Sequence, residues 1–110
     1  DTETQGIGRL NALAYKYLSA DDVKAMNRYS LTGYVAAMLL ESALQACGRS
    51  LTRACLVQKL EQTKNFQSDG IMAPLTFGPG VRQSGTRPIL LKANVAAGKF
   101  ERASDFLSDK

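Results

Sequence analysis

The first half of the chain carries apolar residues at intervals of three and four, which is the spacing of one face of a helix. Ile7, Leu10, Ala14 and Leu18 follow this spacing and predict an amphipathic helix near the start. A longer run of the same kind predicts the main helix over residues 31–46, with its apolar side chains along one broad stripe. Because an apolar stripe is stable only when covered, we expect both helices to pack against other elements.

Residues that cap helices divide this half of the chain into separate elements. Ser19, followed three positions later by Asp22, is typical of a capping box and predicts a short capped turn that continues to Met26. Ser30 is expected to cap the start of the main helix. Gly48 follows the main helix and supplies the permissive backbone that commonly ends one.

A further helix is expected to begin at Thr52 and to end near Lys64. Threonine is a good N-cap because its hydroxyl oxygen accepts a backbone N–H, and Leu51 before it can pack on Leu56 inside the first turns. This element and the main helix form a predicted helical hairpin. Helices are therefore expected over about residues 7–64.

After residue 65 the hydrophobic pattern changes to alternation, which predicts extended structure. Residues 71–77 alternate in this way, but Pro74 removes one backbone donor, so we expect an edge or irregular strand there. Residues 89–95 carry the best strand signal, and Ala97-Gly98 predicts a turn after them. Short C-terminal strands and a crossover are thus expected over about residues 70–101, which makes the predicted fold class α/β.

Four short motifs occur in order along the chain: Gly33-Tyr34, Leu51-Thr52-Arg53, Asn65-Phe66 and Phe77-Gly78-Pro79-Gly80. In this order they resemble the C-terminal third of type I periplasmic substrate-binding proteins of the branched-chain amino acid transport class. The resemblance covers nearly the whole chain. Ala73 departs from the family, which usually has a second glycine before the position of Pro74.

The resemblance implies a partial lobe of the type I periplasmic-binding-protein fold. In that family a small solute is held in the cleft between two α/β lobes and is handed to an ABC transporter. Residues 1–110 would supply the last helices of one lobe, the final crossover and the terminal strands. Because the family's members are considerably longer and this sequence starts without a methionine, we expect it to be a fragment of such a receptor.

The function implied by this resemblance is recognition of a solute, an amino acid or a related aromatic or aliphatic carboxylate, for uptake from the periplasm. The implied partners are that solute and the membrane permease of an ABC transporter. Tyr29 is the candidate ligand contact, because a residue just before the long helix can face the cleft in relatives; ordinary packing is the alternative role for this side chain. The fragment alone would expose apolar helix faces and is expected to self-associate.

Composition argues against an enzyme. The chain contains no histidine, which excludes a Ser-His-Asp triad, a Cys-His pair and histidine-dependent zinc sites within these residues. Asp21 and Asp22 are adjacent, so on a helix they point about 100° apart and cannot act together as acid and base. We therefore predict no catalytic residue, no metal ligand and no cofactor.

The net charge of +4 comes from 14 basic and 10 acidic residues, and the basic residues are scattered singly. They lack the clustered face with interleaved aromatic residues that nucleic-acid grooves use. A solvated surface is the simpler explanation, and we expect no nucleic-acid partner. A weak nucleic-acid binder is retained as a third hypothesis, behind a small helical interaction module in which residues 31–60 bind a partner helix.

Cys47 and Cys55 lie at the facing ends of the two predicted hairpin helices. A disulfide bond between them would close a short loop and stabilise the hairpin. The alternative is that both are buried thiols that act as small apolar side chains. Sequence spacing does not decide between the two.

Overall fold

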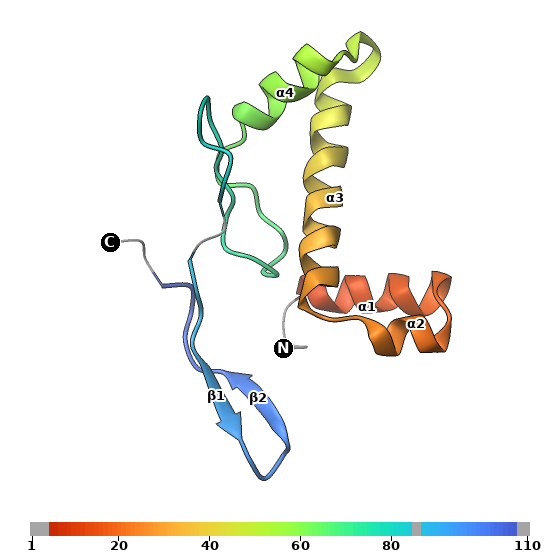
Figure 1. Ribbon diagram of the computed structural model, residues 1–110, viewed down its shortest axis with the longest axis vertical. Coiled ribbons are helices and arrows are strands. Elements are labelled where there is room, and N and C mark those ends of the chain that lie inside the picture. The colour runs from red at the N-terminus through yellow and green to blue at the C-terminus, as the bar shows by residue number, and fades with distance from the viewer. Residues whose placement is uncertain (1–4, 85–86, 108–110) are drawn as a thin grey trace.

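The computed structural model describes residues 5–84 and 87–107. Helices make up the first part of the chain, an irregular loop follows, and a β-hairpin lies near the C-terminus (Figure 1). The predicted combination of helices with a small sheet is therefore confirmed. The described elements are α1 (Gln5–Tyr17), α2 (Ala20–Ala25), α3 (Arg28–Cys47), a 3-10 turn (Gly48–Ser50), α4 (Arg53–Glu61), β1 (Leu91–Asn94) and β2 (Lys99–Arg102).

The capped turn predicted after the first helix is present as α2. The Ser19 hydroxyl oxygen accepts the backbone N–H of Asp22 at 3.1 Å and donates to the Asp22 carboxylate at 2.7 Å. Acidic residues in this first turn also complement the partial positive charge of the helix N-terminus. The sequence therefore identified the cap and its partner correctly.

Ser30 was wrongly predicted as the cap of the main helix. Asn27 is the N-cap, and its side-chain oxygen accepts the backbone N–H of Tyr29 at 2.9 Å. Ser30 lies inside the first turn, where its hydroxyl oxygen accepts the Asn27 N–H at 3.2 Å. The two residues therefore form a capping box. Because asparagine and serine are comparable caps, the sequence favoured the wrong one, and α3 begins three residues earlier than expected. At the other end Gly48, with φ of 55°, terminates α3 as predicted.

The N-cap predicted for α4 is confirmed, because the Thr52 hydroxyl oxygen accepts the Cys55 N–H at 3.0 Å. The helix ends at Glu61, slightly before the expected position near Lys64. Beyond Glu61 the backbone bonds to the loop instead, since the Thr63 carbonyl oxygen accepts the Phe77 N–H at 3.0 Å; the Lys64 ammonium group also donates to the Phe77 carbonyl oxygen at 2.7 Å. α3 and α4 pack against each other and form the predicted helical hairpin.

The strand expected over residues 71–77 is reduced to an isolated bridge. Phe66 and Leu75 exchange backbone hydrogen bonds of 2.8 and 3.0 Å in antiparallel fashion. Between them the chain turns through Asp69 and Gly70, both with positive φ. The buried Ser68 hydroxyl fixes this turn by accepting the Met72 N–H at 2.9 Å. The apolar alternation therefore reflects a turn with inward-facing residues rather than a regular strand.

The small core lies where α1, α3 and this loop contribute side chains. α1 is joined to the loop by a hydrogen bond of 3.0 Å from the Gly6 N–H to the Asp69 carbonyl oxygen and by an ion pair of 2.9 Å between Arg9 and Asp69. The buried apolar residues are Leu10, Ala14, Val35, Ala43, Cys47, Ala73 and Leu75.

No helix of the described residues is long and apolar enough to span a membrane.

The β-hairpin stands apart from the helices in Figure 1 and has two different faces. Antiparallel register pairs Leu91 with Arg102 and Ala93 with Phe100 on one face, whereas the pairs on the other face are polar or charged. Leu91 is 52% exposed and Phe100 is 67% exposed. The predicted turn after the first strand is confirmed, since Gly98 has a φ of 62° and donates its N–H to the Val95 carbonyl oxygen. The apolar face of this hairpin is thus uncovered.

The molecule is flat and open. Its principal extents are 53 × 41 × 18 Å, so the shortest is less than half of either of the other two. Its radius of gyration is 16.3 Å, against about 13 Å for a compact domain of this size. The accessible surface is 8152 Å², whereas a compact protein of the same mass exposes about 5,900 Å². The chain therefore forms essentially one layer of secondary structure.

The contact between α1 and the loop gives a test of this fold. A Cβ at Gly6 would lie 2.8 Å from the Ser68 carbonyl oxygen and 2.7 Å from an Ile71 side-chain carbon, so Gly6→Ala should lower the free energy of unfolding by about 1–3 kcal/mol. Gly8 on the same helix has no such neighbour, and Gly8→Ala should raise it by up to about 1 kcal/mol. Urea denaturation followed by circular dichroism measures both. Equal effects of the two substitutions would contradict this packing.

Candidate functional site

A groove lies between α3, α4 and the loop that follows α4. It consists of two adjoining hollows that share Leu39, and we call it the α3–α4 groove. The first hollow, of about 180 Å³, is lined by Leu39, Leu60, Phe77, Val81 and Arg82. The second, of about 260 Å³, continues along both helices and is lined by Leu39, Ser42, Ala43, Ala46, Lys59, Gln62, Thr63, Lys64 and Phe66.

The helical period accounts for one wall of this groove. Leu39, Ala43 and Ala46 lie three or four positions apart and share one face of α3. The opposite wall needs the loop, since Gly78 and Val81 form an antiparallel bridge that returns Val81 beside Phe77. Small residues on α3 and large ones on the loop therefore leave a channel that the chain's own side chains do not fill.

The rim of the α3–α4 groove is basic. Its lining includes three cations and no acidic residue. Arg82 is paired at 2.6 Å with Glu61, which lies outside the lining, and the Lys64 ammonium group is hydrogen-bonded to a carbonyl oxygen. Lys59 is half-buried and makes no ion pair with any of the described residues. The groove thus combines apolar walls with positive charge that carboxylates of this chain only partly balance.

Tyr29, the candidate ligand contact, lies away from this groove. It is 69% exposed in the first turn of α3. The Arg28 guanidinium group lies 5.0 Å from the centre of its ring and donates a hydrogen bond of 3.0 Å to its hydroxyl oxygen. Tyr29 lines neither hollow of the groove, so the described residues do not build an enclosed site around it.

Cys47 and Cys55 are joined by a disulfide bond in the structure, with a Cα–Cα distance of 6.1 Å. The bond links the last residue of α3 to the first turn of α4. Cys47 is buried, and the bond fixes the end of the hairpin from which the two helices diverge. It therefore holds the walls of the α3–α4 groove at one end.

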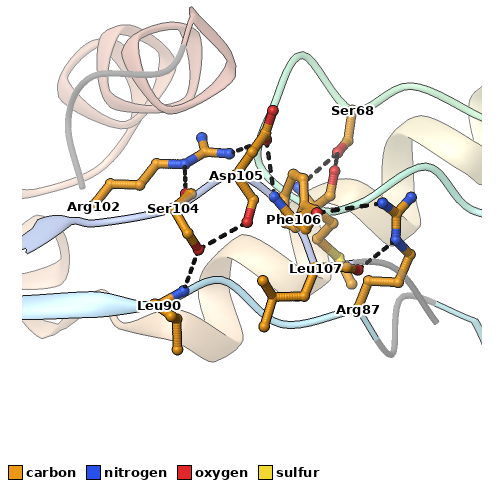
Figure 2. Close-up of polar contacts among 9 residues, drawn as sticks. Ser68, Arg87, Leu90, Arg102, Ser104, Asp105, Phe106 and Leu107 are labelled. Carbon is orange, nitrogen blue, oxygen red and sulfur yellow. Dashed lines mark hydrogen bonds and ion pairs between the residues drawn. The ribbon is translucent and has the colours of Figure 1, made fainter. Parts of the chain in front are cut away.

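A polar hollow near the C-terminus is lined by side chains that hydrogen-bond to other groups of the chain (Figure 2). Arg87 donates to the Leu107 carbonyl oxygen at 2.8 Å, and Arg102 donates to the Ser104 carbonyl oxygen at 2.9 Å and to the Asp105 carboxylate at 2.7 Å. These bonds hold the last described residues beside the start of the hairpin. Since the Arg102 guanidinium group, which lines the hollow, already has partners, the polar groups there have a structural role.

The described residues contain no cluster of three or more histidine, cysteine, aspartate or glutamate side chains able to hold a metal ion.

The α3–α4 groove itself was missed from the sequence. A usable signal was present in the turn at Gly78-Pro79-Gly80, because a tight turn after Phe77 returns the next apolar residue, Val81, to the same place.

Comparison of the chain with protein-family models, with curated proteins and with solved structures found no match in any of the three.

The disulfide bond gives a direct prediction. Alkylation of the unreduced protein should modify neither Cys47 nor Cys55, and reduction before alkylation should expose two thiols in the intact mass. Replacing both by alanine should lower the free energy of unfolding by about 2–3 kcal/mol, because the bond closes a short loop in the unfolded chain. Two modified thiols without prior reduction would contradict the bond.

Proposed function

We propose that this chain is part of an extracytoplasmic solute-binding protein of the type I periplasmic class, and that the complete protein captures a small solute for an ABC transporter. The solute class is an amino acid or a related carboxylate, and the transporter permease is the membrane partner. The role is recognition without catalysis. The chain supplies the final helices and terminal strands of one lobe, as its resemblance to that class suggests.

The observation that carries this proposal is the single-layer shape of the chain. Domains normally consist of two or three packed layers around one core. Here the accessible surface exceeds that of a compact protein by about 2,200 Å², which is more than the roughly 800 Å² that each partner buries in a standard interface. A missing layer of the same polypeptide accounts for an excess of this size.

The placement of three of the four motifs also supports the proposal. Gly33-Tyr34 lies in the long helix α3, and Leu51-Thr52-Arg53 opens α4 with Thr52 as its cap. Phe66 begins the loop bridge, and Gly78 begins the tight turn that ends with Val81. Three of the four motifs therefore have a definite structural role in this chain, whereas Gly33-Tyr34 lies inside α3 and a Cβ at Gly33 would meet no neighbour.

The uncovered hairpin agrees with the same proposal. A two-stranded hairpin is at best marginally stable in water, and this one leaves Leu91 and Phe100 more than half exposed on its apolar face. In a lobe, neighbouring strands or helices would cover that face. Solute would then bind between this lobe and the other, and closure would follow from its higher affinity for the closed arrangement.

A helical interaction module is the second candidate function, and the α3–α4 groove is the observation that favours it. The groove is formed by the hairpin over residues 31–60 together with the following loop. Amphipathic helices commonly bind in such apolar grooves. This role is compatible with membership in a larger receptor, because the groove is present in the chain by itself.

The proposal predicts an effect of Tyr29 in the complete protein. The reading frame upstream of Asp1 should encode two α/β halves, and the expressed product should bind an amino acid or small carboxylate in titration calorimetry. Tyr29→Ala should weaken binding about tenfold, since an aromatic contact would be lost. Tyr15→Ala is the matched control, because Tyr15 is 75% exposed on α1. An upstream sequence without α/β halves would refute the proposal, whereas unchanged affinity of Tyr29→Ala would remove only Tyr29 from the site.

Self-association of the isolated 110-residue chain is a second expected outcome. Uncovered apolar residues such as Tyr29, Leu40 and Phe100 should drive association of copies as concentration rises. Sedimentation equilibrium should therefore give a weight-average mass above that of the monomer at high concentration. A single monomeric species over the whole range would contradict the assignment of these surfaces as uncovered layers.

A further inference from the structure

We propose that the α3–α4 groove binds an acidic amphipathic helix, which places one large apolar side chain in the hollow at Leu39 and Leu60 and a carboxylate beside Lys59. The partner is a separate polypeptide. This inference does not depend on the solute-binding role, since every residue that it uses belongs to the described part of this chain.

The apolar hollow is of a size to take one large side chain. Its volume is about 180 Å³, whereas only the two hollows together reach the roughly 300–1,000 Å³ of small-molecule sites. Its walls are Leu39, Leu60, Phe77 and Val81, all partly exposed. A single leucine or phenylalanine from a partner would cover them, as anchor residues do at the centres of interfaces.

Charge complementarity identifies the partner as acidic. Lys59 and Lys64 line the second hollow, and Arg82 lines the first, with no acidic residue in either lining. Glu61 neutralises Arg82 alone. Lys59 has no ion-pair partner among the described residues and is half-buried, so a carboxylate beside it would gain from partial exclusion of water. A basic or neutral helix would leave this lysine uncompensated.

The arrangement of the two hollows favours a helical partner. The two hollows meet at Leu39, and both are lined by residues of α3 and α4. Residues three or four apart on a helix have Cβ atoms about 5–6 Å apart, so an apolar residue and an acidic residue at that spacing reach adjoining hollows. Binding of an amphipathic helix in a groove between helices is a common mode of peptide recognition.

The test uses the complete 110-residue chain and two fluorescein-labelled helical peptides. Both carry leucine at the anchor positions, and the charged positions four residues later are glutamate in one peptide and lysine in the other. Fluorescence anisotropy should show saturable binding of the glutamate peptide, at least about tenfold tighter than binding of the lysine peptide. Absence of saturable binding by the glutamate peptide, or equal binding of both, would overturn the proposal.

Two matched pairs of variants locate the site. Val81→Asp places a charge in the apolar hollow at a residue that is 50% exposed, and Val95→Asp makes the same change at a residue that is 90% exposed on the hairpin. Lys59→Glu is matched by Lys24→Glu on α2. Val81→Asp and Lys59→Glu should each weaken binding about tenfold, with normal helical circular dichroism, whereas the controls should leave it unchanged.

The outcomes separate specific binding from its alternatives. Equal loss in the two lysine variants would mean that net charge alone attracts the peptide, and the proposal would fail. Octanoate serves as the probe for a free amphiphilic carboxylate. If octanoate binds in a manner sensitive to Val81→Asp while the glutamate peptide does not bind, the occupant is a small molecule and the helix proposal is overturned.

Discussion

A single layer of secondary structure can bury only a small part of its apolar surface, and this constraint governs the whole chain. α3 illustrates it: Val35 is 1% exposed toward the small core, whereas Leu40 is 44% exposed elsewhere on the same helix. The β-hairpin also leaves an apolar side chain uncovered, since Phe100 is 67% exposed. Because hydrophobic burial supplies most of the favourable free energy of folding, a chain that leaves these apolar side chains exposed gains little of that contribution.

Local interactions hold the chain together where the small core does not. The Cys47–Cys55 bond joins α3 to α4, the Ser68 hydroxyl fixes the turn after Phe66, and Asp69 ties that turn to α1. None of these depends on a large core. The Cys47–Cys55 bond, together with the Glu61–Arg82 ion pair and the hydrogen bond from Lys64 to Phe77, holds the walls of the α3–α4 groove. A binding surface can therefore exist on a chain whose own core is small.

The sequence predicted those features that depend on neighbours in the chain. Helical spacing, the caps at Ser19 and Thr52, and the turn at Gly98 each depend on residues a few positions apart, and all are present. Asn27 was missed because Ser30 is also a good cap, and only the backbone decides which position each occupies. The groove was missed for a different reason: it needs Val81 to return beside α3, which is a contact between distant segments.

We propose that the β-hairpin and the open side of α3 lie beneath a second layer in the complete protein. Amide hydrogen exchange measures this directly, by comparing the 110-residue chain with the complete protein read from its gene. The account predicts that amides in β1 and β2 exchange rapidly in the isolated chain and become strongly protected in the complete protein. Equally strong protection of these amides in the isolated chain would contradict it.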